Sequence, residues 1–527
     1  MNARRIILTL VVAAGALVSL GQNSDAVVRD KMTAAVMKVY DDHLAQNPSD
    51  YNVLFARAHQ HFYNGDYTAA LADLNQALLL TPKTDKELRF DEYILRARIS
   101  DARQDYTGEL ADLNMAHELQ PKSLACTDLI AKANLKLGNL AAAEKAFKTI
   151  LRSESLNYDA MYGLAQVALA RGDNKSAISH VTKAVELFRV EPQVYVNRAD
   201  IYARQGDVTA AVQDLLNGMS VGDGGIAAQR LFDLSDKHYN EVMTALADIA
   251  DHDGTDGGLY RYLRANVAID HCQYLQAMED LQRIKRDQMY DSPNVDYLMS
   301  KCCLELARYD EALTHVDNAI NRDPLQPEYY LVKSQAEYYA AGDQGNYDAA
   351  MEALNRCSQE FPEYVPMLLA KASLFTSQGK DKEALGYLNA AVANDPNDAQ
   401  ALLYRALVLK RLGLDNLVMR DLNTVVLMSD DLYDLKGFAL SELGRDNDAF
   451  RWMNSLTTMN QPGGENYYIA ALFMAYRGDN FRARDFLEKA IDQGFGSVHR
   501  LKHDTLSPLN LKSLRSEPEF EKLQIRN

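Results

Sequence analysis

The chain has 527 residues, of which 47% are hydrophobic and 24% are charged, and its formal net charge is −17 at pH 7. Because a single hydrophobic core stops growing at about 250–300 residues, this length excludes one compact core and directs the search toward repeated modules. An acidic surface repels phosphate backbones, so the charge argues against nucleic acid as a partner.

The N-terminal element is predicted to be a signal peptide. Arg4 and Arg5 lead into an apolar or small run over residues 6–20, and a small residue follows at the position that a signal peptidase reads. We therefore expect residues 1–21 to be removed before Gln22, which leaves a periplasmic or secreted protein. A membrane helix needs about 20 apolar residues, so retention as an anchor is the less favoured alternative and no span is expected in the mature chain.

A repeating helical hairpin occupies most of the remaining sequence. The turn glycines Gly138, Gly172 and Gly206 are each 34 residues apart, and LADLNQA at 71–77 returns as LADLNMA at 110–116. Each unit predicts two amphipathic helices, because a turn glycine closes the first helix in the left-handed conformation and an aspartate then caps the second. A fixed period of this length is typical of one supersecondary unit stacked many times.

The residues at fixed places of the hairpin carry a family resemblance. Small residues recur on the first helix, as at Ala58 and Ala97, and on the second helix, as at Ala70. Aromatic residues such as Tyr67 follow the turn, and prolines such as Pro82 end the second helix. This pattern resembles the tetratricopeptide repeat family, including bacterial exported arrays of that family. The resemblance implies an all-α, right-handed superhelical solenoid of about thirteen helical hairpins.

The predicted organisation has six segments. They are a signal peptide at 1–21, an N-terminal capping helix at 22–49, an N-terminal array at 50–225, a degenerate hairpin and bend at 226–258, a C-terminal array at 259–494, and a C-terminal cap at 495–527. The bend is expected because its hairpin lacks the turn glycine and most of the small residues. The cap is expected to cover the apolar face of the last helix, which has no further neighbour.

Catalytic or metal-binding chemistry is suggested at a few places, and each departs from its template. The acidic loop at 251–258 lacks the invariant glycine and the closing glutamate of a calcium loop, so an ordinary turn is the better interpretation. His499 and His503 have the spacing of a zinc-binding helix, but Arg500 stands where the catalytic glutamate belongs. No phosphate-binding glycine loop or nucleophile elbow is present in the sequence.

The five cysteines provide neither a zinc site nor a disulfide framework, because their number is odd and no C-x-x-C pair occurs. His271 precedes Cys272, but adjacent residues on a helix point about 100° apart, which places them poorly for proton transfer. A disulfide between Cys272 and either Cys302 or Cys303 stays open. We therefore expect no enzyme activity, no cofactor and no metal, and no small-molecule substrate is evident.

The concave face implied by the resemblance offers candidate partner contacts. First helices line this face in the family, and the positions carried over are Arg98, Lys132, Tyr162, Gln166, Asp200, Arg204, Tyr262, Asn266, Tyr297, Lys301, Gln335 and Tyr338. A tyrosine with an amide one turn later suits an extended peptide, because the amide bonds its backbone while the ring packs on its side chains. The alternative is a solvated face without a specific ligand.

Two further features bear on this face. The family's carboxylate clamp needs lysine at the fifth place of the first helix, where this chain has residues such as Phe55 and Tyr162, so the clamp is not expected. Arginine or lysine beside the small residue of the first helix, as at Arg57, Arg96 and Arg198, predicts an architectural ion pair or a side-chain stem that covers the helix seam.

These expectations lead to a functional hypothesis. We expect a non-enzymatic scaffold or adaptor for protein–protein interaction in the bacterial cell envelope, which binds a protein or an extended peptide in its concave groove. The alternative is a periplasmic holdase-type chaperone for exported clients, which fits the same acidic surface and tyrosine-rich groove.

Overall fold

The computed structural model describes residues 36–222, 224–252, 257–342, 345–414, 417–427, 433–458, 463–503, 508–515 and 520. The expected signal peptide and the start of the capping helix lie outside these ranges. The chain has two compact units, Met1–Leu231 and Phe232–Asn527, and each is described by itself. Within the described ranges, no helix is both long enough and apolar enough to cross a membrane.

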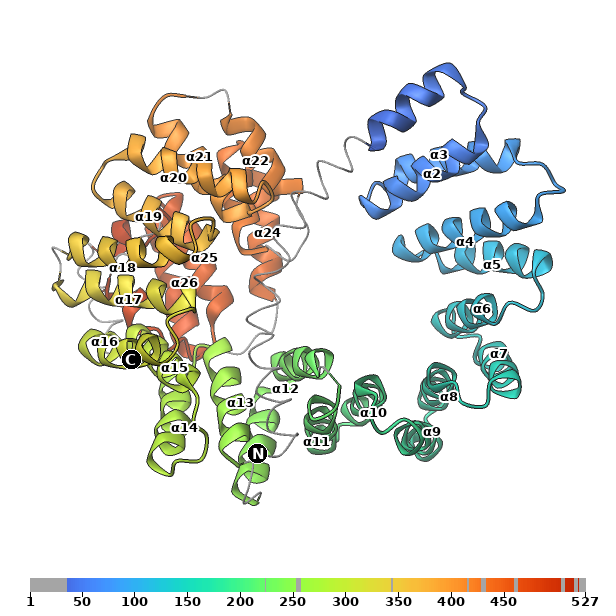
Figure 1. Ribbon diagram of the computed structural model, residues 1–527, viewed down its shortest axis with the longest axis horizontal. Coiled ribbons are helices and arrows are strands. Elements are labelled where there is room, and N and C mark those ends of the chain that lie inside the picture. The colour runs from blue at the N-terminus through green and yellow to red at the C-terminus, as the bar shows by residue number, and fades with distance from the viewer. Residues whose placement is uncertain are drawn as a thin grey trace. The chain divides into compact units, whose positions relative to one another are not determined.

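The first unit is a run of helical hairpins (Figure 1). A helical segment at residues 36–46 precedes it. Its helices are α2 (Tyr51–Tyr63), α3 (Tyr67–Leu80), α4 (Lys86–Ala102), α5 (Tyr106–Leu119), α6 (Leu124–Lys136), α7 (Leu140–Ser153), α8 (Tyr158–Ala170), α9 (Asn174–Leu187), α10 (Pro192–Arg204) and α11 (Val208–Met219). Each even-numbered helix pairs with the helix that follows it, and successive hairpins stack.

The first hairpin shows why this sequence folds in this way. Gly65 has φ +76°, a left-handed conformation that L side chains rarely adopt, and it ends α2. The Asp66 carboxylate then accepts a hydrogen bond from the amide of Ala69 at 3.0 Å and caps α3. Ala58 and Ala70 are fully buried, because small side chains let the two helix axes approach closely. The turn glycine, the capping aspartate and the small residues predicted from the sequence therefore each have a structural role in this hairpin.

An arginine–aspartate pair joins the two helices of several hairpins. Arg198 on α10 donates from Nε and Nη2 to both oxygens of Asp214 on α11, each at 2.6 Å. The same bidentate pair, with the same separation of 16 residues, links Arg57 to Asp73, Arg96 to Asp112 and Arg405 to Asp421. The architectural ion pair predicted for the arginines beside the small residues is present at these hairpins.

Helix α12 (Gly225–His252) spans most of the segment predicted to be a degenerate hairpin. Two helical stretches join in it across His238, whose φ of −135° and ψ of 45° lie outside the helical region. The boundary between the two units, after Leu231, falls inside this helix. Without a turn glycine, the chain bends at a single residue instead of forming a separate loop.

The second unit continues the same pattern of hairpins (Figure 1). Its helices are α13 (Gly257–Asp270), α14 (Tyr274–Arg286), α15 (Pro293–Glu305), α16 (Tyr309–Arg322), α17 (Pro327–Ala340), α18 (Tyr347–Glu360), α19 (Val365–Ser377), α20 (Asp381–Asn394), α21 (Ala399–Arg411), α22 (Val418–Leu427), α23 (Tyr433–Glu442), α24 (Asp446–Thr458), α25 (Glu465–Tyr476), α26 (Asn480–Asp492), α27 (Val498–Lys502) and α28 (Lys512–Arg515). The predicted all-α solenoid of hairpins is confirmed in both units.

The five cysteines are buried free thiols. Cys302 and Cys303 are fully buried, and Cys272 is 3% exposed. Burial raises the pKa of the Cys126 and Cys357 thiols to about 11. The Cys126 and Cys357 side chains are therefore neutral core residues. The structure contains no disulfide between Cys272 and Cys302 or Cys303.

Candidate functional site

The candidate groove residues of the first unit lie on successive first helices. Arg98 on α4, Lys132 on α6 and Arg204 on α10 are exposed, whereas Tyr162, Gln166 and Asp200 are half-buried. These first helices contact one another, as α2 does with α4, α6 with α8 and α8 with α10. A partner that lies across them therefore meets at least one of these side chains on each of α4, α6, α8 and α10.

Two of these residues tie neighbouring hairpins together. The Tyr162 hydroxyl on α8 donates to Asp200 on α10 at 2.9 Å, and Asp200 in turn accepts from Arg230 at 2.5 Å. Burial, and then the negative charge of Asp200, raises the pKa of Tyr162 to about 12. Tyr162 and Asp200 are thus already bonded within the protein. Their first role is to fix the spacing of the hairpins.

Other groove cations are available to a partner. Among the described residues, Arg98 and Arg204 make no ion pair, while Lys132 pairs with Asp128 one turn earlier at 2.6 Å. The Lys132 side chain is 47% exposed, so water screens this pair strongly and its strength is small. Arg98 and Lys132 are therefore free to bind an anionic group on adjacent helices.

An aromatic face on α2, which was not among the residues predicted from the sequence, lies near Arg98. Phe55, His59 and Tyr63 follow one another at a spacing of four residues, with ring centroids 6.2 Å and 4.8 Å apart. The Tyr63 side chain is 68% exposed although it is large and apolar. Burial, and then the positive charge of Arg98, lowers the pKa of His59, so the imidazole stays neutral. The spacing in the sequence was the signal that could have revealed this face.

The candidate groove residues of the second unit are packed differently from those of the first unit. Tyr262 is 3% exposed, and its ring lies 5.2 Å from that of Tyr290. Asn266 donates to the backbone carbonyl of Tyr262 at 2.8 Å and not to a position open to a ligand. Tyr262 therefore packs in the core, because the Tyr290 ring fills the space beside it, whereas Asn266 is half-buried.

The remaining candidates of this unit show the same tendency. Tyr297 is half-buried, and its ring lies 4.9 Å from that of Tyr329. Tyr338 is half-buried with its ring 5.0 Å from the ring of Tyr339, and Lys301 is half-buried as well. Gln335 is exposed. The tyrosines of the second unit thus mostly contact one another, whereas the first unit presents exposed cations and Tyr63.

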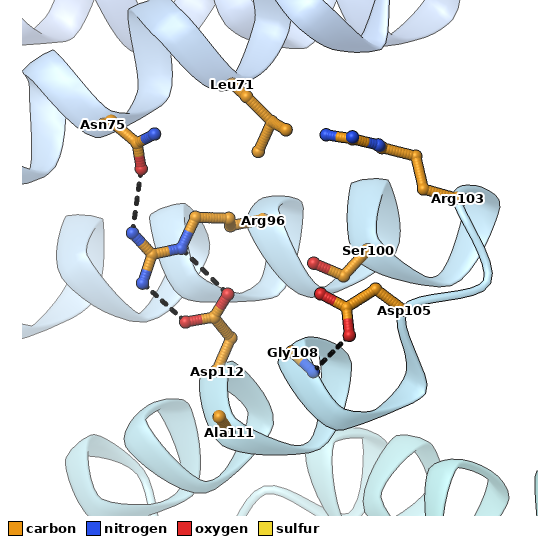
Figure 2. A pocket seen from close by; sticks show the side chains of 9 residues that line it. All are labelled: Leu71, Asn75, Arg96, Ser100, Arg103, Asp105, Gly108, Ala111 and Asp112. Atoms are coloured by element: carbon orange, nitrogen blue, oxygen red, sulfur yellow. Dashed lines mark hydrogen bonds and ion pairs between the residues drawn. The ribbon is translucent and has the colours of Figure 1, made fainter.

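A pocket of about 480 Å³ lies between the first two hairpins of the first unit (Figure 2). On one side Arg96 is held by Asp112, at 2.8 and 2.6 Å, and by Asn75 at 2.9 Å. Figure 2 shows Arg103 extending across the pocket toward Leu71. Two arginines and two aspartates line the pocket, so it carries no net charge. It has room for a polar group but no nucleophile with an adjacent base.

A cluster of Asp236, Asp270 and His271 in the second unit has the composition of a metal site, since its ligand atoms lie within 4.8 Å of one another. The Ser235 hydroxyl donates to the carbonyl of Phe232 at 2.7 Å, so it must accept from His271 Nε2, 3.0 Å away. That nitrogen therefore carries a proton and has no lone pair for a metal. A hydrogen bond between α12 and the turn after α13 therefore accounts for the position of His271.

The other candidate metal-binding or catalytic residues from the sequence also make structural contacts. Asp251 pairs with the buried Arg261 and, at 3.2 Å, with Arg283, while residues 253–256 of its loop lie outside the described residues. The Cys272 thiol contacts Glu465 at 3.1 Å and not the adjacent imidazole. His499 is buried among aromatic rings, and burial lowers its pKa to about 4.

The comparisons with known proteins agree with this geometry. Sequence models described as "Tetratricopeptide repeat" match residues 129–192, 165–219 and 343–407. "Tetratricopeptide repeat protein 16" of Homo sapiens is 22% identical over 289 residues, which cover 52% of this chain and 30% of that protein. "DnaJ homolog subfamily C member 3" of Gallus gallus is 23% identical over 337 residues, which cover 51% of this chain and 66% of that protein.

One solved structure is also among the similar proteins. The C-terminal part of a tetratricopeptide repeat-containing protein from Cytophaga hutchinsonii is 15% identical, covers 47% of this chain and 94% of that chain, and has a TM-score of 0.33. The chain spans less than two thirds of the length of either curated relative. The matched segments, residues 129–219 and 343–407, are tetratricopeptide repeats, and the other described hairpins are helix pairs of the same kind.

Proposed function

We propose that this chain is a non-enzymatic scaffold that holds an extended, acidic segment of a partner protein across the first helices of its first unit. Tetratricopeptide repeats bind proteins or peptides. The observation that carries the proposal is the row formed by the exposed Tyr63 and the cations Arg98 and Lys132 on α2, α4 and α6. The second unit offers fewer free groups, because its tyrosines contact one another.

The charge and spacing of this row support an acidic, extended ligand. Adjacent helices pack about 8–10 Å apart, and an extended chain covers that distance in about three residues. A carboxylate on every third residue therefore meets Arg98 and Lys132 in turn, while Tyr63 offers a ring to a neighbouring apolar side chain. The net charge of the chain is −17, so an acidic ligand is repelled by most of the surface and attracted to the local positive row.

A peptide-display selection on the full chain tests this function. Enriched peptides should contain spaced acidic residues and should bind the double variant Arg98→Glu/Lys132→Glu about tenfold or more weakly. The matched control is Lys145→Glu/Arg152→Glu, which makes the same change in net charge at exposed positions on the second helix α7. Equal affinity for wild type and the groove variant would contradict the proposal, as would an equal loss in the control.

The setting of this function is also a proposal. The predicted signal peptide supports export, and with it a scaffold in a bacterial cell envelope. N-terminal sequencing of the chain recovered from a periplasmic extract should begin at Gln22. Recovery of a chain that begins at Met1 in the soluble cytoplasmic fraction would overturn the envelope setting and leave the binding proposal intact.

A periplasmic holdase is the second candidate. It is favoured by the likeness to "DnaJ homolog subfamily C member 3", which extends over 51% of this chain. A holdase should suppress the aggregation of several unrelated unfolded clients, with no requirement for acidic residues in them. A scaffold with a specific partner should not, so an aggregation assay with clients of different charge separates the two functions.

A further inference from the structure

The two ends of the second unit's hairpin run touch each other. The turn between α13 and α14 packs against the loops that precede α25 and follow α26. A Cβ atom added to Gly463 would lie 2.1 Å from the carbonyl oxygen of His271, and one added to Gly496 would lie 2.3 Å from that of Cys272. Both distances are far below any real contact, so glycine is required at both places. The backbones of the first and last hairpins of this unit are in direct contact.

A half-buried ionic network lies at this contact. Arg500 on α27 donates to Glu465 on α25 at 2.6 Å, to Glu305 on α15 at 3.4 Å and to the Tyr274 hydroxyl on α14 at 3.1 Å. The Cys272 thiol bonds Glu465 at 3.1 Å, although the two residues are 193 positions apart. The two carboxylates raise the pKa of Arg500 against the opposing effect of burial. We call Cys272, Tyr274, Glu305, Glu465, Ser497 and Arg500 the latch, since Ser497 also donates to Glu305.

Aromatic contacts extend the latch along α27. His499 accepts or donates a hydrogen bond with the Tyr309 hydroxyl at 3.0 Å, and its ring lies 4.5 Å from that of Tyr339. His503 lies 5.5 Å from Tyr309, ring centre to ring centre. Helix α27 therefore lies against α15 and its neighbours, while α28 lies against α25 and α26. The C-terminal segment contacts hairpins from both ends of the unit and not the last hairpin alone.

The latch holds a conformation that the local sequence does not favour. Cys272 has φ +57°, whereas the corresponding turns at Gly65, Gly138 and Gly172 use glycine for the same conformation. A side chain in this region is strained, although Gln104 and Ala307 adopt the same conformation in corresponding turns. Arg500, Glu305 and Glu465 are half-buried, so their ion pairs give specific pairing and little net stability, because the charges lose part of their hydration and water screens the rest.

We propose that the latch closes the second unit on itself and is the conformational gate of that unit. The first and last hairpins separate at this contact as one event, in which Arg500, Glu305 and Glu465 regain water. A partner of the second unit must then either accept the closed form or displace α27. The inference does not depend on the proposed function, which rests on the first unit.

The Cys272 thiol reports on the latch in the full chain. We compare its alkylation by iodoacetamide in wild type and in Gly496→Ala, quantified by peptide mass spectrometry, with the fully buried Cys357 as the internal reference. The control is Gly386→Ala, where an added Cβ meets no atom within 4 Å. Gly496→Ala should accelerate alkylation of Cys272 roughly tenfold while Cys357 stays slow, because the added methyl group separates the two backbones.

A second variant decides the result if Gly496→Ala unfolds the unit and Cys357 also reacts. Arg500→Lys keeps the charge but loses the planar fork that reaches Glu465, Glu305 and Tyr274 together. It should accelerate Cys272 alone. Rates for Cys272 that equal the wild-type rate in Arg500→Lys, or in a folded Gly496→Ala variant, would overturn the proposed gate.

Discussion

Removal of Asp214 should destabilise its hairpin far more than removal of an exposed partner in an equally short ion pair. The Asp214 side chain is 4% exposed and that of Arg198 is 17% exposed, and both hydrogen bonds between them measure 2.6 Å. Breaking a buried pair leaves an uncompensated charge, which costs about 3–5 kcal/mol. Asp214→Ala should therefore lower the local unfolding free energy of α10 and α11 by about that amount.

The control is Asp485→Ala on α26. Asp485 pairs with Lys489 at 2.8 Å, but their side chains are 55% and 50% exposed, so the expected loss is below about 1 kcal/mol. Because stacked repeats unfold locally, native-state hydrogen exchange on the amides of each hairpin is the suitable assay. Similar losses for both variants would refute the architectural role of the arginine–aspartate pairs. Replacement of both Arg198 and Asp214 by apolar residues of similar size should recover much of the loss.

Further predictions concern packing and protonation. Gly163→Ala should destabilise the array by about 1–3 kcal/mol in urea unfolding, because the new Cβ would lie 2.3 Å from the ring of Phe147. Gly386→Ala, with open space around its Cβ, should instead stabilise α20 by about 0.5–1 kcal/mol. The pKa of His499 is lowered to about 4 from an unfolded value near 6.5, so its contribution is complete above pH 6.5 and is lost as the pH falls toward 4. The free energy of unfolding should fall by about 3 kcal/mol in wild type over this pH range and should not fall in this way in His499→Gln. Parallel pH profiles of thermal stability for the two proteins would contradict this prediction.

The hairpin itself could be predicted from the sequence because its determinants are local. Gly65 ends one helix and Asp66 caps the next within a few residues, so the pattern of letters carries the turn directly. The regular recurrence of cations beside small residues predicted either an ion pair or a side-chain stem over the helix seam at Arg57, and the structure shows an ion pair with Asp73. Each of these contacts joins residues of one hairpin.

The candidate site was less predictable because it depends on how hairpins pack on one another. The place of Tyr262 on its helix suggested a groove contact, but its ring is buried against Tyr290 from the following loop. The contact between Cys272 and Glu465 spans 193 residues. A small rotation at each step of a repeat array accumulates over many hairpins, so the segments that finally meet cannot be read from the local pattern.

The most direct test of the proposed binding function is a hydrogen-exchange footprint of the full chain with a display-selected acidic peptide bound. The account predicts slower exchange on the first helices α2, α4 and α6, centred on the turns of helix that carry His59, Arg98 and Lys132, with the second helix α7 unchanged. Protection confined to α13, α15 and α17 of the second unit, or no protection on α4 and α6, would contradict it.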